Sequence, residues 1–270
     1  MFYQKDYFKR IFLSLLFVYL FSSSPIISLP VADELPDVIE ICTDAEWPPY
    51  DYKDPRNKNK PVGATIDILH EIFKRRNMKI DIKILPWKRC EHRVERGQSH
   101  MIIDLSINPE REKKYLISDP LYELKHAFYY EKSRYPEGPD IRAVEDVNNF
   151  SVGSILGYNL DIYKFDISKV DSGAATIERL LKKLRLRYID LVIGYIEIYQ
   201  GLAAIGRIDL SGLDYIEIPE TPSKLYYVMF TRKKGKGGKK LLEIFNQGLE
   251  QLKSEGYYHR VFQKYGIPVE

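Results

Sequence analysis

The segment 108–111 reads Asn-Pro-Glu-Arg and has the residue types of an anion site. Asn as a cap followed by Pro at the first helical position predicts a helix start. Arg111 then lies in the first turn, where a cation opposes the helix dipole at a cost of some tenths of a kcal/mol. Free N–H groups beside a guanidinium suit a carboxylate, which arginine can bind through two parallel hydrogen bonds. Pairing of Arg111 with Glu110, Glu112 or Asp119 at the surface is an equally good interpretation of the local chemistry.

Sequence motifs for other chemistry are absent from the chain. It contains no Gly-x-Ser-x-Gly elbow, His-Glu-x-x-His pair, Walker loop or dinucleotide-binding glycine fingerprint. The five histidines are scattered and have no metal-binding spacing with one another or with a cysteine. A net charge of only +3 argues against nucleic-acid binding driven by overall basicity. These observations predict a binding protein without cofactor or metal rather than an enzyme.

The composition predicts a globular chain of one large domain or two small ones. Of 270 residues, 44% are apolar and 29% are charged, which excludes both disorder and a multi-span membrane protein. Aromatic residues make up 13%, and 21 of them are tyrosines. Tyrosine combines an apolar face with a polar tip, so this bias suits a pocket that holds a polar molecule.

The N-terminus predicts a targeting segment over residues 1–32. Three basic residues precede an apolar run, Ile11 to Phe21, which is followed by serines and a proline. This order is typical of a cleaved secretory signal, and the run is shorter than the ~20 residues that cross a bilayer. An uncleaved anchor is the alternative, because no charge occurs from residue 11 to 32. Cleavage after Ser24, Ser28 or Ala32 is equally compatible with the sequence.

The two cysteines, Cys42 and Cys90, allow two interpretations. In an exported protein they can pair in an oxidising compartment, provided that their Cα atoms come within about 7 Å. Two separate buried thiols are an equally good interpretation.

Short apolar runs alternate with helical patterns along the chain, which predicts an α/β fold. Residues 51–60 are predicted to form a polar loop. Strands are predicted at 38–42, 79–85, 101–103, 127–130, 150–155, 189–193 and 225–231. Helices are predicted around 66–73, 177–184, 241–252 and 257–265.

Taken together, eight stretches resemble the bacterial extracellular solute-binding proteins of family 3, which have the type 2 periplasmic binding protein fold. They occur in the order of that family and cover nearly all of the chain after residue 32. The stretches are 43–50, 63–67, 85–89, 107–111, 118–122, 152–158, 188–192 and 256–262. The resemblance implies two α/β lobes that close on a solute, with crossover strands near 127–130 and 226–230. Lobe 1 would comprise 33–126 and 228–270, and lobe 2 would comprise 127–227.

The resemblance also assigns roles within lobe 1. Arg111 matches the arginine that binds the solute carboxylate, and Asp104 and Ser106 match the pocket edge just before it. Asp44 and Trp47 match the first loop, where an aromatic ring covers the ligand.

Three further positions complete the implied site. Trp87 would form a pocket wall, although core packing is an equally good interpretation. In lobe 2, Gly157 and Tyr158 match a loop whose N–H groups face the carboxylate. Tyr195 departs from the family, because amino-acid binders have an acidic residue there that binds the ammonium group. Asp104 or Asp44 could supply that charge, or Tyr195 could make a cation–π contact.

The function implied by the resemblance is capture of a small carboxylate-bearing polar solute, an amino acid or a related compound. The protein would be a periplasmic monomer that delivers the solute to an inner-membrane ABC transporter permease, without a nucleic-acid partner. One alternative is a dehydratase-like enzyme on the same fold, with Asp44, Glu46 or Asp104 as the acid or base. Another is a periplasmic sensor module.

Overall fold

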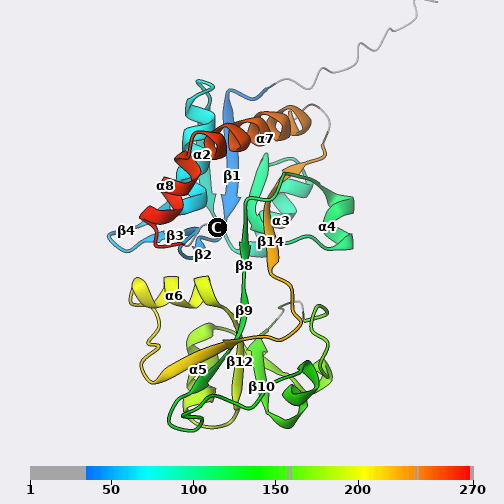
Figure 1. Ribbon diagram of the computed structural model, residues 1–270. Helices are drawn as coiled ribbons and strands as arrows, with labels where there is room; N and C mark the ends of the chain where they lie inside the picture. Colours follow the sequence, from blue (N-terminus) through cyan, green and yellow to red (C-terminus); the bar gives the residue numbers. More distant parts are fainter. Residues whose placement is uncertain (1–34, 157, 159, 234, 236, 268–270) are drawn as a thin grey trace, which may run out of the picture. The chain divides into compact units, whose positions relative to one another are not determined.

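The computed structural model describes residues 35–156, 158, 160–233, 235 and 237–267 (Figure 1). The predicted signal segment, 1–32, lies outside the described residues. Within the described part of the chain, none of the helices has the length and apolar character needed to span a membrane.

A six-stranded mixed sheet forms the first half of the fold (Figure 1). Its strands run in the order β5-β1-β6-β14-β7, and β8 pairs with the first residues of β14. Strand β1 is parallel to β5 and β6, whereas β14 is antiparallel to β6, β7 and β8. The bounds are β1 Val38–Thr43, β5 Lys79–Ile84, β6 Met101–Leu105, β7 Tyr115–Ile117, β8 Tyr122–Leu124 and β14 Lys224–Thr231.

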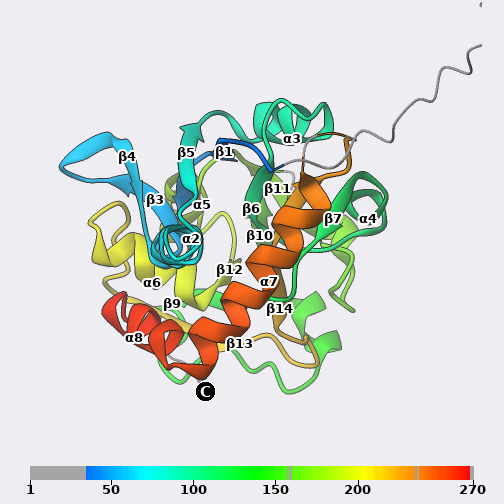
Figure 2. The same cartoon turned by 90° about the horizontal axis from the view of Figure 1, so that it is seen from above.

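Helices cover both faces of this sheet. Ile39 and Ile41 belong to the large apolar cluster that includes α2 and α7, whereas Cys42 packs with Val94 of α3. This division arises because successive side chains of a strand point to opposite faces. Figure 2 shows α8 following directly from α7, and both helices contact α2. The bounds are α2 Ala64–Lys74, α3 Trp87–Glu95, α4 Pro109–Lys114, α7 Gly238–Ser254 and α8 Tyr257–Lys264.

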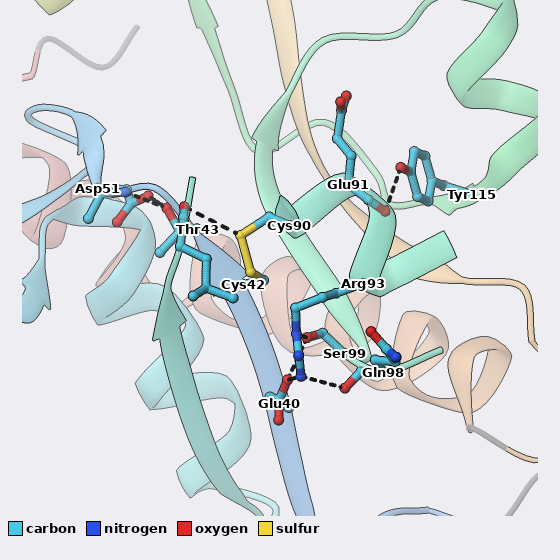
Figure 3. Close-up of a disulfide and its surroundings, with 12 residues drawn as sticks. Glu40, Cys42, Thr43, Asp51, Cys90, Glu91, Arg93, Gln98, Ser99 and Tyr115 are labelled. Atoms are coloured by element: carbon cyan, nitrogen blue, oxygen red, sulfur yellow. Dashed lines mark hydrogen bonds and ion pairs between the residues drawn. A yellow bond between two sulfur atoms is a disulfide. The ribbon is translucent and has the colours of Figure 1, made fainter. Parts of the chain in front are cut away.

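A disulfide between Cys42 and Cys90 joins the end of β1 to α3 (Figure 3). The two Cα atoms are 5.4 Å apart, within the usual range for a disulfide. Of the two interpretations left open by the sequence, pairing is therefore correct. The bond holds α3 against the end of β1, close to the loop that follows that strand.

The prediction of a polar loop at 51–60 is wrong, because this segment contributes to a three-stranded antiparallel sheet. Its strands are β2 Glu46–Trp47, β3 Asp51–Asp54 and β4 Asn57–Val62. Most of these side chains are polar, so the strands lack the apolar alternation that marks a half-buried strand. Gly63 links β4 to α2 at φ 135°, and a Cβ there would lie 2.2 Å from the carbonyl oxygen of Tyr50. This close approach requires glycine.

A second sheet of five strands forms the other half of the fold, in the order β11-β10-β12-β9-β13 (Figure 1). The bounds are β9 His126–Glu131, β10 Val152–Ile155, β11 Asp171–Ala174, β12 Leu191–Tyr195 and β13 Leu213–Glu217. Its helical segments are α5 Ile177–Arg185, α6 Ile196–Ala204 and the 3-10 turns η1 Val144–Asn149 and η2 Ile167–Lys169. The side chain of Thr176 caps α5 by accepting a hydrogen bond from the N–H of Arg179, and the predicted apolar stripe of that helix is buried.

Two segments connect the sheets. The chain passes from β8 to β9 through Lys125, and it returns between Glu217 and Lys224. The stretches predicted as crossovers, 127–130 and 226–230, lie inside β9 and β14, so each crossing comes a few residues earlier in the chain. We refer to the first sheet and its helices as lobe 1 and to the second sheet and its helices as lobe 2. The exact lobe boundaries remain a prediction.

Candidate functional site

One cavity, of about 770 Å³, is lined by residues from both lobes. Lobe 1 contributes the loop after β1, the start of α3 and the segment from β6 to α4, whereas lobe 2 contributes the ends of β10 and β12. Eight of the nine residues predicted to bind ligand line it: Asp44, Trp47, Trp87, Asp104, Ser106, Arg111, Tyr158 and Tyr195. The ninth, Gly157, lies outside the described residues. The fold therefore brings together positions that are far apart in the sequence.

The guanidinium of Arg111 forms part of the cavity wall. The predicted cap is present, since Asn108 Oδ1 accepts a hydrogen bond of 2.8 Å from the backbone N–H of Arg111. From this position the side chain donates from Nη1 to the carbonyl oxygen of Ser106 at 2.9 Å. It is 20% exposed, and its Cζ atom lies 5.8 Å from the centre of the Trp87 ring. Because the cap occupies the N–H of Arg111, the guanidinium itself is the better donor to an anion.

The anionic neighbour of Arg111 is Glu91 of α3, at 3.4 Å, and not one of the three residues considered from local sequence. Glu110 instead pairs with Lys114. Figure 3 shows Glu91 beside the disulfide, which attaches its helix to β1. The side chain of Glu91 is only 14% exposed, and the local sequence did not single this residue out. The useful signal was its position directly after Cys90, whose partner lies in β1.

Aromatic rings from both lobes form another part of the cavity lining. Trp47 of lobe 1 lies 5.7 Å from Tyr195 of lobe 2 and 5.7 Å from Tyr226 of β14, measured between ring centres. Tyr195 and Tyr226 are 6.1 Å apart and nearly perpendicular. Such edge-to-face geometry is favourable between aromatic rings. Sequence reasoning missed Tyr226 because it lies in a strand that was read only as a crossover.

The carboxyl groups of Asp44, Asp51 and Asp104 form an acidic group in the cavity lining. Asp44 acts electrostatically on Asp51 and Asp104, Asp104 acts on Asp51, and burial raises the pKa of all three. The pKa of Asp104 is raised to about 7. Asp51 was not recognised from the sequence, because it lies in the segment that was read as a loop.

The cavity also contains a basic region around Arg111. Lys224, at the start of β14, lines the cavity, and burial together with the charge of Arg111 lowers its pKa. Among the charged residues of the lining, Arg111 and Lys224 thus form a basic pair, whereas Asp44, Asp51 and Asp104 form an acidic group. A ligand with both a carboxylate and a cationic group matches this division of charge.

Direct contacts join the lobes beside the cavity. Arg207 of lobe 2 forms an ion pair with Glu46 of lobe 1 and lies 3.6 Å from Glu178 of its own lobe. Gly201 of α6 packs against Pro48, and a Cβ at this glycine would lie 2.7 Å from the Pro48 carbonyl oxygen. The absence of a side chain at Gly201 therefore permits the close approach of the lobes.

Two sheets joined by two crossings, with a charged and aromatic cavity between them, define a two-lobed solute-binding protein with the type 2 periplasmic binding protein fold. The chain belongs to the bacterial extracellular solute-binding proteins, family 3, whose pattern it matches over residues 39–268.

Curated relatives and solved structures agree with this assignment. A probable histidine-binding protein of Neisseria gonorrhoeae is 22% identical, covering 84% of this chain and 82% of the relative. An L-cystine-binding protein of Bacillus subtilis (strain 168) is 21% identical, covering 84% and 81%. An ancestral arginine-binding protein bound to arginine has a TM-score of 0.65 and 22% identity, covering 86% of this chain and 99% of that one.

The same fold also occurs in proteins with other roles. A histidine kinase sensor domain has a TM-score of 0.66 at 17% identity, covering 84% of this chain and 95% of the domain. An ancestral amino acid-binding protein that is a precursor of cyclohexadienyl dehydratase has a TM-score of 0.66 at 18% identity, covering 85% and 95%. At these identities the likeness concerns the fold, so the function must be argued from the site.

Proposed function

We propose that this protein captures an amino acid or a closely related carboxylate-bearing solute in the periplasm and delivers it to an inner-membrane ABC transporter permease. The observation that carries the proposal is the Arg111 guanidinium, which lies in the wall of an interlobe cavity between Ser106 and Glu91. A guanidinium held in this way can bind a carboxylate with little loss of side-chain freedom. The named relatives that bind histidine and cystine support the choice of an amino-acid ligand.

In this proposal Arg111 and Lys224 face the carboxylate of the ligand. The rest of the ligand is enclosed by Trp47, Tyr158 and Tyr195. Approach of the lobes removes water from the cavity, which strengthens the charge pairing. Binding to the closed form then shifts the equilibrium between open and closed lobes, as expected for hinge closure. The ligand leaves chemically unchanged.

Calorimetric titration tests the role of Arg111. Standard L-amino acids are first screened by thermal shift, since a ligand that binds the native state raises its melting temperature. For any amino acid that binds, Arg111→Ala should lose at least tenfold in affinity, or ~1.4 kcal/mol. Arg111→Lys should recover only part of the loss, because lysine cannot form two parallel bonds to a carboxylate.

Two controls separate loss of the anion site from other effects. Arg89→Ala removes a cation from an exposed position of the same α3 helix that bears Glu91, and it should bind normally. The double variant Arg111→Ala and Glu91→Gln is the second control. In Arg111→Ala alone, the Glu91 carboxylate has lost its arginine partner, and the double variant removes this unpaired charge. Normal affinity in Arg111→Ala would contradict the proposal.

The enzyme and sensor alternatives predict different results. Asp44, Glu46 and Asp104 line the cavity and could act as an acid or base. Mass spectrometry of a bound amino acid after prolonged incubation distinguishes these cases, because a receptor returns it intact and a dehydratase does not. Permease and ATPase genes beside the coding sequence would support transport, whereas a membrane kinase gene would favour sensing.

The periplasmic location is a further part of the proposal. It is supported by the basic and apolar segment at the N-terminus and by the disulfide, which is typical of an oxidising compartment. Mass spectrometry of the protein from a periplasmic extract should show a mature chain that starts between residues 25 and 33. Recovery of the full-length chain in the membrane fraction would favour an uncleaved anchor.

A further inference from the structure

Asp104 has an unusual backbone conformation at a position that lines the cavity. Its φ is 60°, in the left-handed region that favours glycine and that few non-glycine residues adopt, aspartate being one of the more frequent. Asp104 lies near the end of β6, seven residues before Arg111. Strained backbone of this kind is concentrated at functional sites.

The Asp104 carboxylate is buried and only half satisfied. The side chain of this residue is held by two donors, since Thr65 Oγ1 and the Tyr122 hydroxyl donate to Oδ1 at 2.8 and 2.9 Å. The residue is 8% exposed, and its Oδ2 has no hydrogen-bond partner among the described residues.

Asp51 has the same features on a neighbouring element. It is 1% exposed, its Oδ2 accepts a hydrogen bond from Thr43 Oγ1, and its Oδ1 has no partner within the described chain. Neither Asp51 nor Asp104 forms an ion pair with any described lysine or arginine. Two neighbouring buried carboxylates without a countercharge are unfavourable, so one must bind a proton or meet a cation.

The groups that face Asp104 come from several elements and supply no positive charge. Thr65 of α2 and Tyr122 of β8 donate hydrogen bonds, Asp44 acts on it as a like charge, and Asp104 in turn acts as a like charge on Asp51. Tyr50 also lies within its electrostatic reach, and burial raises the pKa of this tyrosine. In the described part of the chain, no three Asp, Glu, His or Cys residues converge to hold a metal ion. An organic cation is therefore the matching partner.

We infer that Asp104 selects the cationic group of the ligand, and that this ammonium or guanidinium group displaces the proton that Asp104 binds in the unliganded protein. The inference rests on the proposed function, because Arg111 is taken to hold the carboxylate of the same ligand. It explains how the cavity can bind an amino acid although Tyr195 is not acidic. The displaced proton passes to solvent, so ligand affinity depends on pH.

The expected size of the effect follows from the pKa of Asp104, which burial raises to about 7. A group with this pKa is about nine-tenths protonated at pH 6 and about one-tenth protonated at pH 8. Ligand binding should therefore release close to one proton at pH 6 and little at pH 8. The apparent affinity should rise about tenfold between these pH values, because a protonated Asp104 must lose its proton before the cationic group can bind.

The experiment counts protons by isothermal titration calorimetry in two buffers with different enthalpies of ionisation, phosphate and Bis-Tris at pH 6, and phosphate and Tris at pH 8. The probes are those standard L-amino acids that raise the melting temperature at pH 8. L-Histidine needs a correction, because its own imidazole titrates in the same range. For L-histidine, the relevant value is the difference in the number of protons released between the parent protein and Asp104→Asn.

Asp104→Asn should release no proton and should lose at least tenfold in affinity at pH 8, while Thr65 and Tyr122 keep an acceptor. Asp104→Gly serves as a second variant, because glycine tolerates a φ of 60°. Glu250→Gln removes an exposed carboxylate from α7, outside the cavity lining, and should behave as the parent.

The outcomes separate this inference from the proposed function. If no amino acid raises the melting temperature, the proposed function itself fails. If amino acids bind without proton release, and Asp104→Asn binds them as well as the parent does, the function stands and the inference is overturned. The proton count of the parent protein tests the inference even if neither variant folds.

Discussion

Replacement of Asp104 by asparagine should change how the stability of the unliganded protein depends on pH. The pKa of Asp104 is about 7 in the folded protein, because burial disfavours its charged form, whereas an aspartate in an unfolded chain titrates near 4. Between these values the folded state binds the additional proton. The parent protein should therefore lose stability as pH rises from about 4 to 7, and Asp104→Asn should lack the part of this loss that Asp104 contributes, while Asp44 and Asp51 keep theirs.

The magnitude follows from the width of that interval. Each pH unit between the two pKa values changes the free energy of unfolding by about 1.4 kcal/mol for one proton. From pH 5 to 8, Asp104→Asn should gain about 3 kcal/mol of stability relative to the parent. For a chain of this size this corresponds to roughly 6–12 °C in melting temperature.

Urea denaturation at pH 5, 6, 7 and 8 measures the effect, with tryptophan fluorescence as the signal. Trp47 and Trp87 both line the cavity, so their emission should report its opening. His126 produces the opposite slope, because burial lowers its pKa to about 4 and stability is lost as pH falls from 6.5 towards that value. It is present in both proteins and cancels in the difference. A stability difference that stays constant from pH 5 to 8 would refute the reasoning.

Two further predictions concern the disulfide and the contact between the lobes. The bond between Cys42 and Cys90 closes a loop with a sequence separation of 48, so the double alanine variant should lose about 4 kcal/mol in urea denaturation. A loss below 1 kcal/mol would show that loop closure is not its main contribution. Gly201→Ala should weaken amino-acid binding at least fivefold in calorimetry, because its methyl group would separate α6 from Pro48. Its melting temperature should not fall, since alanine favours helix by ~1 kcal/mol over glycine. Gln200→Ala on the same helix should bind normally, and equal affinity in both variants would contradict a role for this contact.

Local sequence patterns determined much of the fold. Asn108 and Pro109 mark the start of α4 because a side-chain cap and a fixed φ act over a few residues. The stripe of Leu180, Leu181 and Leu184 identifies α5 in the same way, through a repeat within one helix. The eight family-like stretches in order identified the family, which the match over residues 39–268 confirms.

The tertiary structure decided which distant groups meet. Arg111 is paired with Glu91 and not with a neighbour in sequence, because the disulfide and the sheet bring α3 beside α4. The pairing of Cys42 with Cys90 required the distance between their Cα atoms, which depends on the whole sheet. Asp51 lies in a hairpin whose polar strands lack an apolar repeat, so its burial beside the cavity had no local signal.

The difference between what the sequence determined and what the tertiary structure decided has a physical origin. Caps, turns and helical repeats arise from interactions between residues within about four positions of one another, so they can be read along the chain. The environment of Asp104 depends on residues distant in sequence: burial raises its pKa, and hydrogen bonds from Thr65 and Tyr122 act against this rise. Residue types therefore identified the charges that this protein can use, and packing decided which of them face one ligand.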